Sequence, residues 1–208
     1  RYVVQAFRTP GSPRGFCIGD GTGVGKTRTA AAVALELASR ASESGNAFRV
    51  AWVSCRQDLE SDVRREYSLV QTAMGHDGGT NLRFSTYGKL RYSSKMSPTE
   101  DSVTFHELRS HLLAGGRDAL LVLDEAHIAR SPKSATGIAV RRLQQQLPAA
   151  NVLYCTATAA SDVQNLSYML RLGLYDDPDG GVRTAPFRSH DHLVSAMQRQ
   201  GPAGLELI

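Results

Sequence analysis

The sequence predicts an α/β fold of three layers, in which a mostly parallel, doubly wound sheet lies between two layers of helices. Short apolar runs alternate with amphipathic segments along most of the 208 residues, which is typical of consecutive strand, helix and strand units. The run over residues 119–123 is apolar at every position, as expected for a parallel strand buried on both faces. Ligands of such sheets bind at the carboxyl ends of the strands, so functional residues are expected there.

The first half of the chain contains two strand and helix units followed by a third strand. Residues 15–19 form a short apolar strand that leads into a glycine-rich turn, and alanines and leucines favour a helix over residues 26–40. The apolar run at residues 48–54 predicts the second strand. Residues 59–74 carry apolar side chains at helical spacing, and residues 82–86 are the expected third strand.

The second half continues this alternation after a loop. Residues 93–101 are polar and contain a proline, so an exposed loop is expected. A helix over residues 105–114 ends at a Gly-Gly pair, and a helix over residues 137–147 ends before a proline. A short apolar run predicts a strand over residues 152–155. The last segments are assigned as a helix, a surface loop and a helix, over residues 162–170, 173–186 and 191–199.

Composition restricts the class of protein. With 41% hydrophobic residues, residues 1–208 can form the core of one domain, and a formal charge of +4 permits contact with nucleic acid. No apolar run approaches the roughly 20 residues of a membrane-spanning helix, so no membrane is expected among the partners. The three cysteines lack metal-binding spacing, which favours an intracellular location without disulfides. The chain opens without a methionine and ends inside a semi-apolar run, so we expect a piece of a longer protein.

A glycine-rich motif lies between the first expected strand and the first expected helix, which is the context of a phosphate-binding loop. Its glycines allow backbone N–H groups to surround phosphates, and the helix N-terminus adds a positive field. Lys26 is expected to reach the β- and γ-phosphates of ATP, and the Thr27 hydroxyl to bind Mg²⁺. The general pattern has glycine where this chain has Asp20. The predicted cofactor-binding residues are Asp20, Gly21, Thr22, Gly23, Val24, Gly25, Lys26 and Thr27.

An Asp-Glu pair directly follows the buried strand. Asp124 is expected to hold Mg²⁺, usually through water, and Glu125 to orient or deprotonate the water that attacks the γ-phosphate. An Asp-Glu pair alone is more often a solvated helix cap, but this pair comes after a phosphate-binding loop and ends a buried strand. The predicted catalytic residues are Lys26, Asp124, Glu125 and His127, and the predicted metal ligands are Thr27 and Asp124.

Thr156 and Thr158 follow the next expected strand, so their hydroxyls should lie beside the carboxylates. We expect them to couple the ATP site to a bound strand of nucleic acid through hydrogen bonds. The alternative is an ordinary helix cap or turn, because threonine is common at both.

The sequences Gly-Lys-Thr, Asp-Glu-Ala-His and Thr-Ala-Thr occur in the order of motifs I, II and III of superfamily 2 helicases, which the chain therefore resembles. It also resembles the Strawberry notch helicase-like family, in which Asp20 is expected. Members of that family often carry glycine in place of Thr27 and cysteine in place of Ala126, so this chain is a divergent member. Three stretches carry this second resemblance, at residues 19–26, 153–174 and 204–207.

The resemblance implies a RecA-like P-loop NTPase domain that is the first of two motor lobes in a larger protein. ATP then lies between the lobes, and the second lobe supplies arginines that stabilise the transition state, so the chain alone should bind nucleotide and hydrolyse it slowly. In helicases, the loops after the second and third strands contact the nucleic-acid backbone. By position, these contacts fall on Ser54, Arg56, Thr86 and Tyr87, and ordinary strand-end loops are the alternative.

The leading hypothesis is an ATP-dependent DNA helicase or translocase, with DNA favoured over RNA as the partner. One alternative is a nucleic-acid-stimulated ATPase that remodels nucleoprotein without unwinding. Another is a nucleotide-gated interaction module with decayed catalysis, against which the intact Lys26, Thr27, Asp124 and Glu125 argue. The location is expected to be cytoplasmic for a bacterial or phage protein and nuclear for a eukaryotic one, and the oligomeric state is left open.

Overall fold

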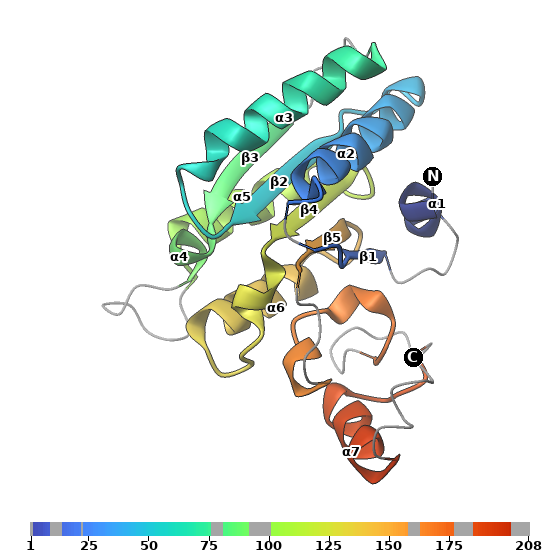
Figure 1. Ribbon diagram of the computed structural model, residues 1–208, viewed down its shortest axis with the longest axis vertical. Coiled ribbons are helices and arrows are strands. Elements are labelled where there is room, and N and C mark those ends of the chain that lie inside the picture. The colour runs from blue at the N-terminus through green and yellow to red at the C-terminus, as the bar shows by residue number, and fades with distance from the viewer. Residues whose placement is uncertain are drawn as a thin grey trace.

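The computed structural model describes residues 2–8, 14–21, 23–75, 81–91, 101–157, 163–176 and 185–200. Within these ranges five strands form one sheet in the order β1-β5-β4-β2-β3, and every neighbouring pair is parallel (Figure 1). The strands are β1 (Gly15–Ile18), β2 (Arg49–Ser54), β3 (Asn81–Thr86), β4 (Ala119–Asp124) and β5 (Asn151–Cys155). The expected parallel sheet is confirmed.

Helices cover both faces of this sheet. On one face, α1, α2 and α3 pack around a core that includes Trp52 and Val122, and on the other α4, α5, α6 and the chain after β5 surround Val53 and Leu123. Figure 1 shows α2 and α3 in front of the sheet and α5 behind it, which confirms the three layers. The helices are α1 (Tyr2–Arg8), α2 (Lys26–Glu43), α3 (Leu59–Met74), α4 (Tyr87–Leu90), α5 (Val103–Leu113), α6 (Ala135–Gln145) and α7 (His190–Gln200), with the 3-10 helices η1 (Ala126–Ala129), η2 (Val163–Leu166) and η3 (Leu170–Leu172).

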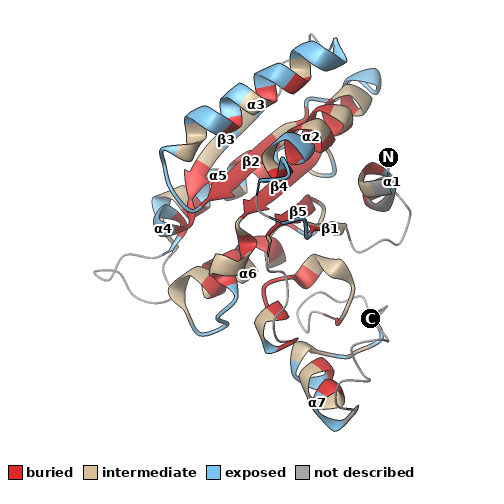
Figure 2. Ribbon diagram, viewed as in Figure 1, coloured by how far each residue is buried: buried red, intermediate tan, exposed pale blue. Residues whose placement is uncertain are grey.

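Burial on both faces explains why the central strands are apolar at almost every position. Val50 and Trp52 belong to the core under α2 and α3, whereas Ala51 and Val53 belong to the core on the opposite face. All positions of β4 are buried, and Figure 2 shows buried residues along the sheet with exposed residues on the outer sides of α2 and α3. Each buried Leu or Val contributes about 1.5–3 kcal/mol relative to an exposed one.

The prediction of a helix over residues 162–170 is wrong. In its described part, the chain forms the two short 3-10 helices η2 and η3 instead of one α-helix. In a continuous helix the Leu166 carbonyl would accept from the N–H of residue 170. It instead accepts from the Met169 N–H at 2.9 Å, with 3-10 spacing, and from the Tyr175 hydroxyl at 3.2 Å. Tertiary hydrogen bonds therefore override a local pattern that favoured a helix.

Three short elements are absent from the sequence predictions. α1, α4 and η1 span seven, four and four residues, which is too short for a helical repeat to be detected in the sequence. The loop expected over residues 93–101 lies outside the described residues except for its last position, and most of the surface loop over 173–186 does as well. None of the helices in the described ranges has the length and apolar character needed to cross a membrane.

Candidate functional site

The glycine-rich loop enters α2 through two residues with left-handed backbone angles. Gly23 has a φ of 82° and Gly25, which precedes the first residue of α2, has a φ of 86°. A Cβ atom added at either position would meet no neighbouring atom, so backbone conformation and not space requires glycine. No side chain caps the N-terminus of α2, which leaves its first N–H groups available to an anion.

Lys26 is the first residue of α2 and its side chain turns back into the loop. Its Nζ atom donates to the carbonyl oxygens of Asp20 at 3.1 Å and Gly21 at 2.8 Å, and only 8% of the residue is exposed. Thr27 is half-buried, whereas Val24 at the tip of the loop is exposed. The loop thus holds a positive charge at its centre, beside the uncapped helix end. Thr22, which was predicted to bind the cofactor, lies outside the described residues.

The register of the sheet brings the end of β1 to the level of the acidic strand end. β5 lies between β1 and β4, and Cys155 of β5 pairs with Ile18 on one side and with Asp124 on the other. Burial raises the pKa of the Cys155 thiol well above its usual value, with Asp124 raising it further and Lys26 lowering it. The thiol therefore lies within electrostatic range of both the loop lysine and the acidic strand end.

The Asp124 carboxylate is buried and held in place by a neighbouring strand. The Ser54 hydroxyl donates to its Oδ2 atom at 2.7 Å, and the Tyr87 hydroxyl donates to its backbone carbonyl at 2.9 Å. Burial raises the pKa of Asp124, and the hydrogen bond from Ser54 partly opposes this effect. The strand end is thus fixed by β2 and α4 in an environment where its negative charge is unfavourable.

Glu125 occupies a strained backbone conformation directly after β4. Its φ and ψ are both 49°, in the left-handed region that costs a residue with a side chain about 1–3 kcal/mol. His127 Nδ1 lies 3.4 Å from a Glu125 carboxylate oxygen and 3.1 Å from the hydroxyl of the fully buried Thr156. The imidazole therefore connects the Glu125 carboxylate to the end of β5. Thr158, the other predicted coupling residue, lies outside the described residues.

The predicted magnesium ligands supply suitable donor atoms. In the part of the chain that the structure describes, no three or more His, Cys, Asp and Glu side chains form a group that could hold a metal ion. Mg²⁺ needs only one or two protein oxygens, because phosphates and water complete its octahedral shell. Thr27 at the start of α2 and Asp124 at the end of β4 offer a hydroxyl and a carboxylate. A cation beside the buried Asp124 would also offset the unfavourable burial of its charge.

The four predicted nucleic-acid contacts divide into three buried residues and one exposed residue. The side chains of Ser54, Thr86 and Tyr87 are buried, so they do not face a partner on the surface. Ser54 and Tyr87 bond to Asp124, and the Thr86 hydroxyl accepts from the backbone N–H of Lys89 at the start of α4. A hydroxyl at a strand end suits an internal hydrogen bond as well as a phosphate contact, and the sheet register decides between them. The fourth residue, Arg56, is exposed.

Ser54 and Tyr87 are therefore candidates for holding Asp124 in place, a role that was not predicted from the sequence. The role of Ser54 follows from the adjacency of β2 and β4. Because Val53 pairs with Leu123, the next residues along the two strands are Ser54 and Asp124. That adjacency is a property of strand order, which the sequence pattern alone does not give.

A family profile described as "P-loop containing NTP hydrolase pore-1" matches residues 3–208. Protein strawberry notch homolog 1 of Rattus norvegicus is 30% identical over an alignment that covers 98% of this chain. Protein strawberry notch of Drosophila melanogaster is 31% identical and Protein FORGETTER 1 of Arabidopsis thaliana is 32% identical, each over 95% of the chain. The chain spans only 17%, 13% and 16% of the lengths of these three relatives.

Proposed function

The chain belongs to the P-loop containing NTP hydrolase pore-1 family. We propose that it is the ATP-binding and ATP-hydrolysing motor domain of a superfamily 2 helicase-like protein. The observation that carries the proposal is the meeting of two half-sites at one edge of the sheet. One is the uncapped start of α2 with Lys26, and the other is the pair Asp124 and Glu125 at the end of β4. Similarity to strawberry notch proteins over nearly the whole chain supports this reading.

In the proposed complex, the phosphates of ATP lie in the glycine-rich loop. The N–H groups at the start of α2 donate to them, and Lys26 Nζ exchanges its bonds with the carbonyls of Asp20 and Gly21 for bonds with phosphate oxygens. Charge-assisted hydrogen bonds of this kind are about twice as strong as neutral ones. Thr27 and Asp124 would hold Mg²⁺, which neutralises charge on the β- and γ-phosphates.

Glu125 is the proposed base for the attacking water. It is adjacent in sequence to the proposed metal ligand Asp124. Its left-handed backbone conformation is strained, and strained residues of this kind cluster at active sites, where the surrounding structure holds them in place. His127, between Glu125 and Thr156, would keep the carboxylate oriented and link its position to β5. The arginines that stabilise the transition state would come from a second lobe and contribute roughly 10³–10⁵ in rate, so this domain alone should be slow.

We extend the proposal to a DNA-backbone surface at the loops after β2 and β3. Lys89 Nζ, on α4 directly after β3, donates to Gln57 Oε1 in the loop after β2 at 2.8 Å. Arg56 in the first loop is paired with Asp58 at 3.3 Å, and both side chains are about two-thirds exposed, so the ion pair is weak. Contacts from Arg56 and Lys89 to phosphates would position a strand without reading its sequence.

Phosphate release from Mg-ATP by the full-length protein tests the proposal. We expect hydrolysis that single-stranded DNA stimulates more than RNA. Glu125→Gln should lower the rate by roughly 10²–10⁴-fold, the usual contribution of a general base, without preventing nucleotide binding. Glu107→Gln, on the exposed side of α5, is the matched control and should hydrolyse normally.

Two results would change the proposed function. Hydrolysis absent under every condition would overturn the ATPase proposal and favour a nucleotide-gated interaction module. Stimulated hydrolysis without strand separation would replace helicase activity with remodelling of nucleoprotein.

A further inference from the structure

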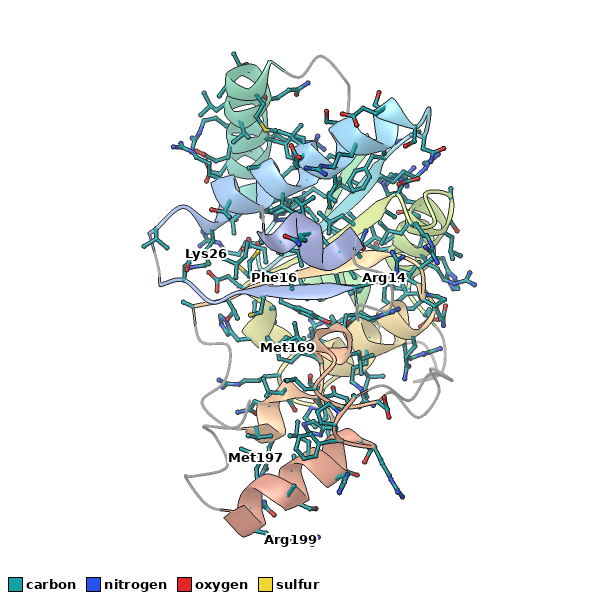
Figure 3. All side chains as sticks on the ribbon, turned by 90° about the vertical axis from the view of Figure 1, so that its right-hand side faces the viewer. Arg14, Phe16, Lys26, Met169, Met197 and Arg199 are labelled. Atoms are coloured by element: carbon teal, nitrogen blue, oxygen red, sulfur yellow. The ribbon has the colours of Figure 1, made fainter. Side chains whose placement is uncertain are left out.

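A cavity of about 240 Å³ lies at the amino-terminal edge of the sheet, opposite the candidate nucleotide site. Figure 3 shows Arg14 at one end of β1 and Lys26 beyond the other end, so the two sites are separated by the length of the strand. The cavity lies between α1, the last turns of α2 and the loop before β4. Its lining includes Phe7, Leu37, Phe48, Arg14, Arg40 and Arg117.

Positive charge dominates the polar lining. Arg14, Arg40 and Arg117 line the cavity together with a single acid, Asp118, whose carboxylate accepts a hydrogen bond from Asn46 at 2.7 Å. Arg40 is explained locally, because it pairs with Glu36 and lies in the last turn of α2, where a basic residue offsets the helix dipole.

Within the described part of the chain, Arg14 and Arg117 have no acidic partner that would account for their positive charge at this place. Among the described residues, neither forms an ion pair with a carboxylate.

Arg14 is held at the cavity by its backbone and its neighbours. Its φ of 56° lies in the left-handed region, which residues other than glycine seldom adopt. One guanidinium nitrogen donates to the Ala149 carbonyl at 3.1 Å and to Asn151 Oδ1 at 3.4 Å. Burial lowers the pKa of Arg14, and the charges of Arg117 and Arg171 lower it further. The fold therefore places the Arg14 guanidinium group where burial and two other positive charges disfavour its own charge, and an anion would relieve this.

Apolar side chains form another part of the lining. Phe7 and Phe48 are buried, as is Leu37 on α2, and all three border the cavity. A guanidinium group matches the geometry of phosphate oxygens, and an aromatic wall suits the flat apolar part of a ligand. The volume also exceeds that of a single phosphate ion.

We propose that this cavity binds a small phosphate ester, with the phosphate on Arg14 and Arg117 and its apolar part against Phe7 and Phe48. The ligand class is a phosphate monoester with a flat or aromatic body. This site is separate from the nucleotide site and does not depend on the function proposed for it.

Calorimetric titration of the whole 208-residue chain with phenyl phosphate tests the proposal. The titration is done with Lys26→Ala, so that the glycine-rich loop does not contribute phosphate binding. Phenyl phosphate should bind more tightly than inorganic phosphate or phenol, since only the ester contacts both walls. Arg117→Ala, which changes an exposed side chain, should weaken binding by roughly tenfold to hundredfold.

Arg64→Ala on α3 removes an exposed arginine away from the cavity and is the matched control, with no expected change. Phe48→Leu tests the apolar wall separately and should weaken phenyl phosphate more than inorganic phosphate. Equal binding with and without Arg117 would overturn the proposal. So would a loss of all phosphate binding upon Lys26→Ala alone, because the glycine-rich loop would then be the only site. Binding of single-stranded DNA through Arg117 without binding of phenyl phosphate would assign this edge to a nucleic-acid backbone instead.

Discussion

The two halves of the candidate nucleotide site are built in different ways. The phosphate-binding half consists of consecutive residues 20–27. Its described part is shaped by the backbone angles of Gly23 and Gly25 and by hydrogen bonds from Lys26. The carboxylate half is assembled from distant parts of the chain around the end of β4. Its contributors are Ser54 of β2, Tyr87 of α4, His127 of η1 and Thr156 after β5.

Substitutions in the two halves should therefore have different effects on ligand binding and on folding. A consecutive loop depends on its own residues, so a change there should affect ligand binding more than folding. The buried carboxylate half depends on strand register and internal hydrogen bonds, so a change there should affect the free energy of unfolding as well as the chemistry. Three substitutions test this contrast.

The largest expected effect is on the loop. Lys26→Ala should lower the affinity for ATP on the order of 10²-fold, because a charge-assisted contact to the phosphates is lost. The free energy of unfolding should change little, since the carbonyls that Lys26 leaves belong to exposed residues and can bond to water. Calorimetric titration and urea unfolding measure the two effects. Arg28→Ala, two residues further along α2 and exposed, is the control, and equal losses of affinity in both variants would contradict the prediction.

A smaller effect is expected from the hydroxyl beside Asp124. Ser54→Ala removes a buried hydrogen bond to a carboxylate and should lower the free energy of unfolding by about 1.5–3 kcal/mol. Ser85→Ala, at a buried position in β3 paired with Val53, has no hydrogen bond to Asp124 to lose and is the matched control. Urea unfolding of both variants gives the comparison. If both lose the same stability, the Asp124 carboxylate does not depend on Ser54.

The smallest expected effect is a gain in stability. Asp124→Asn removes a charge that burial disfavours, and at neutral pH it should raise the free energy of unfolding by roughly 1 kcal/mol, a typical gain when a functional group is replaced. The folded protein binds the Asp124 proton more tightly than the unfolded chain does, so the wild type loses stability as the pH rises from about the unfolded value of 3.8 through the raised pKa.

The advantage of Asp124→Asn should therefore shrink as the pH falls through that window. Urea midpoints of both proteins from pH 7 downward provide the test, and a constant difference would show that the buried charge is not its origin.

The local features of this protein could be predicted from its sequence. Repeating apolar runs predicted the parallel sheet and its three layers, because a strand buried on both faces must be apolar throughout. The loop at residues 20–27 and the pair Asp124 and Glu125 stood out because their chemistry depends on neighbours in the chain. The same motifs indicated the Strawberry notch resemblance, which the comparisons confirm.

The hydrogen-bond partner of a hydroxyl at the end of a strand could not be predicted from the sequence, because it depends on tertiary packing. Ser54 and Tyr87 were expected to face nucleic acid and instead bond to Asp124. Ser54 does so because β2 lies beside β4 in the sheet, and Tyr87 reaches the same strand end from α4. Likewise, two short 3-10 helices replace the helix expected at residues 162–170, and the Leu166 carbonyl accepts from the Met169 N–H and the Tyr175 hydroxyl. The physical reason is common to both. A polar group is satisfied by whichever partner the packed chain brings within about 3 Å, and that partner is set by tertiary packing and not by local sequence preference alone.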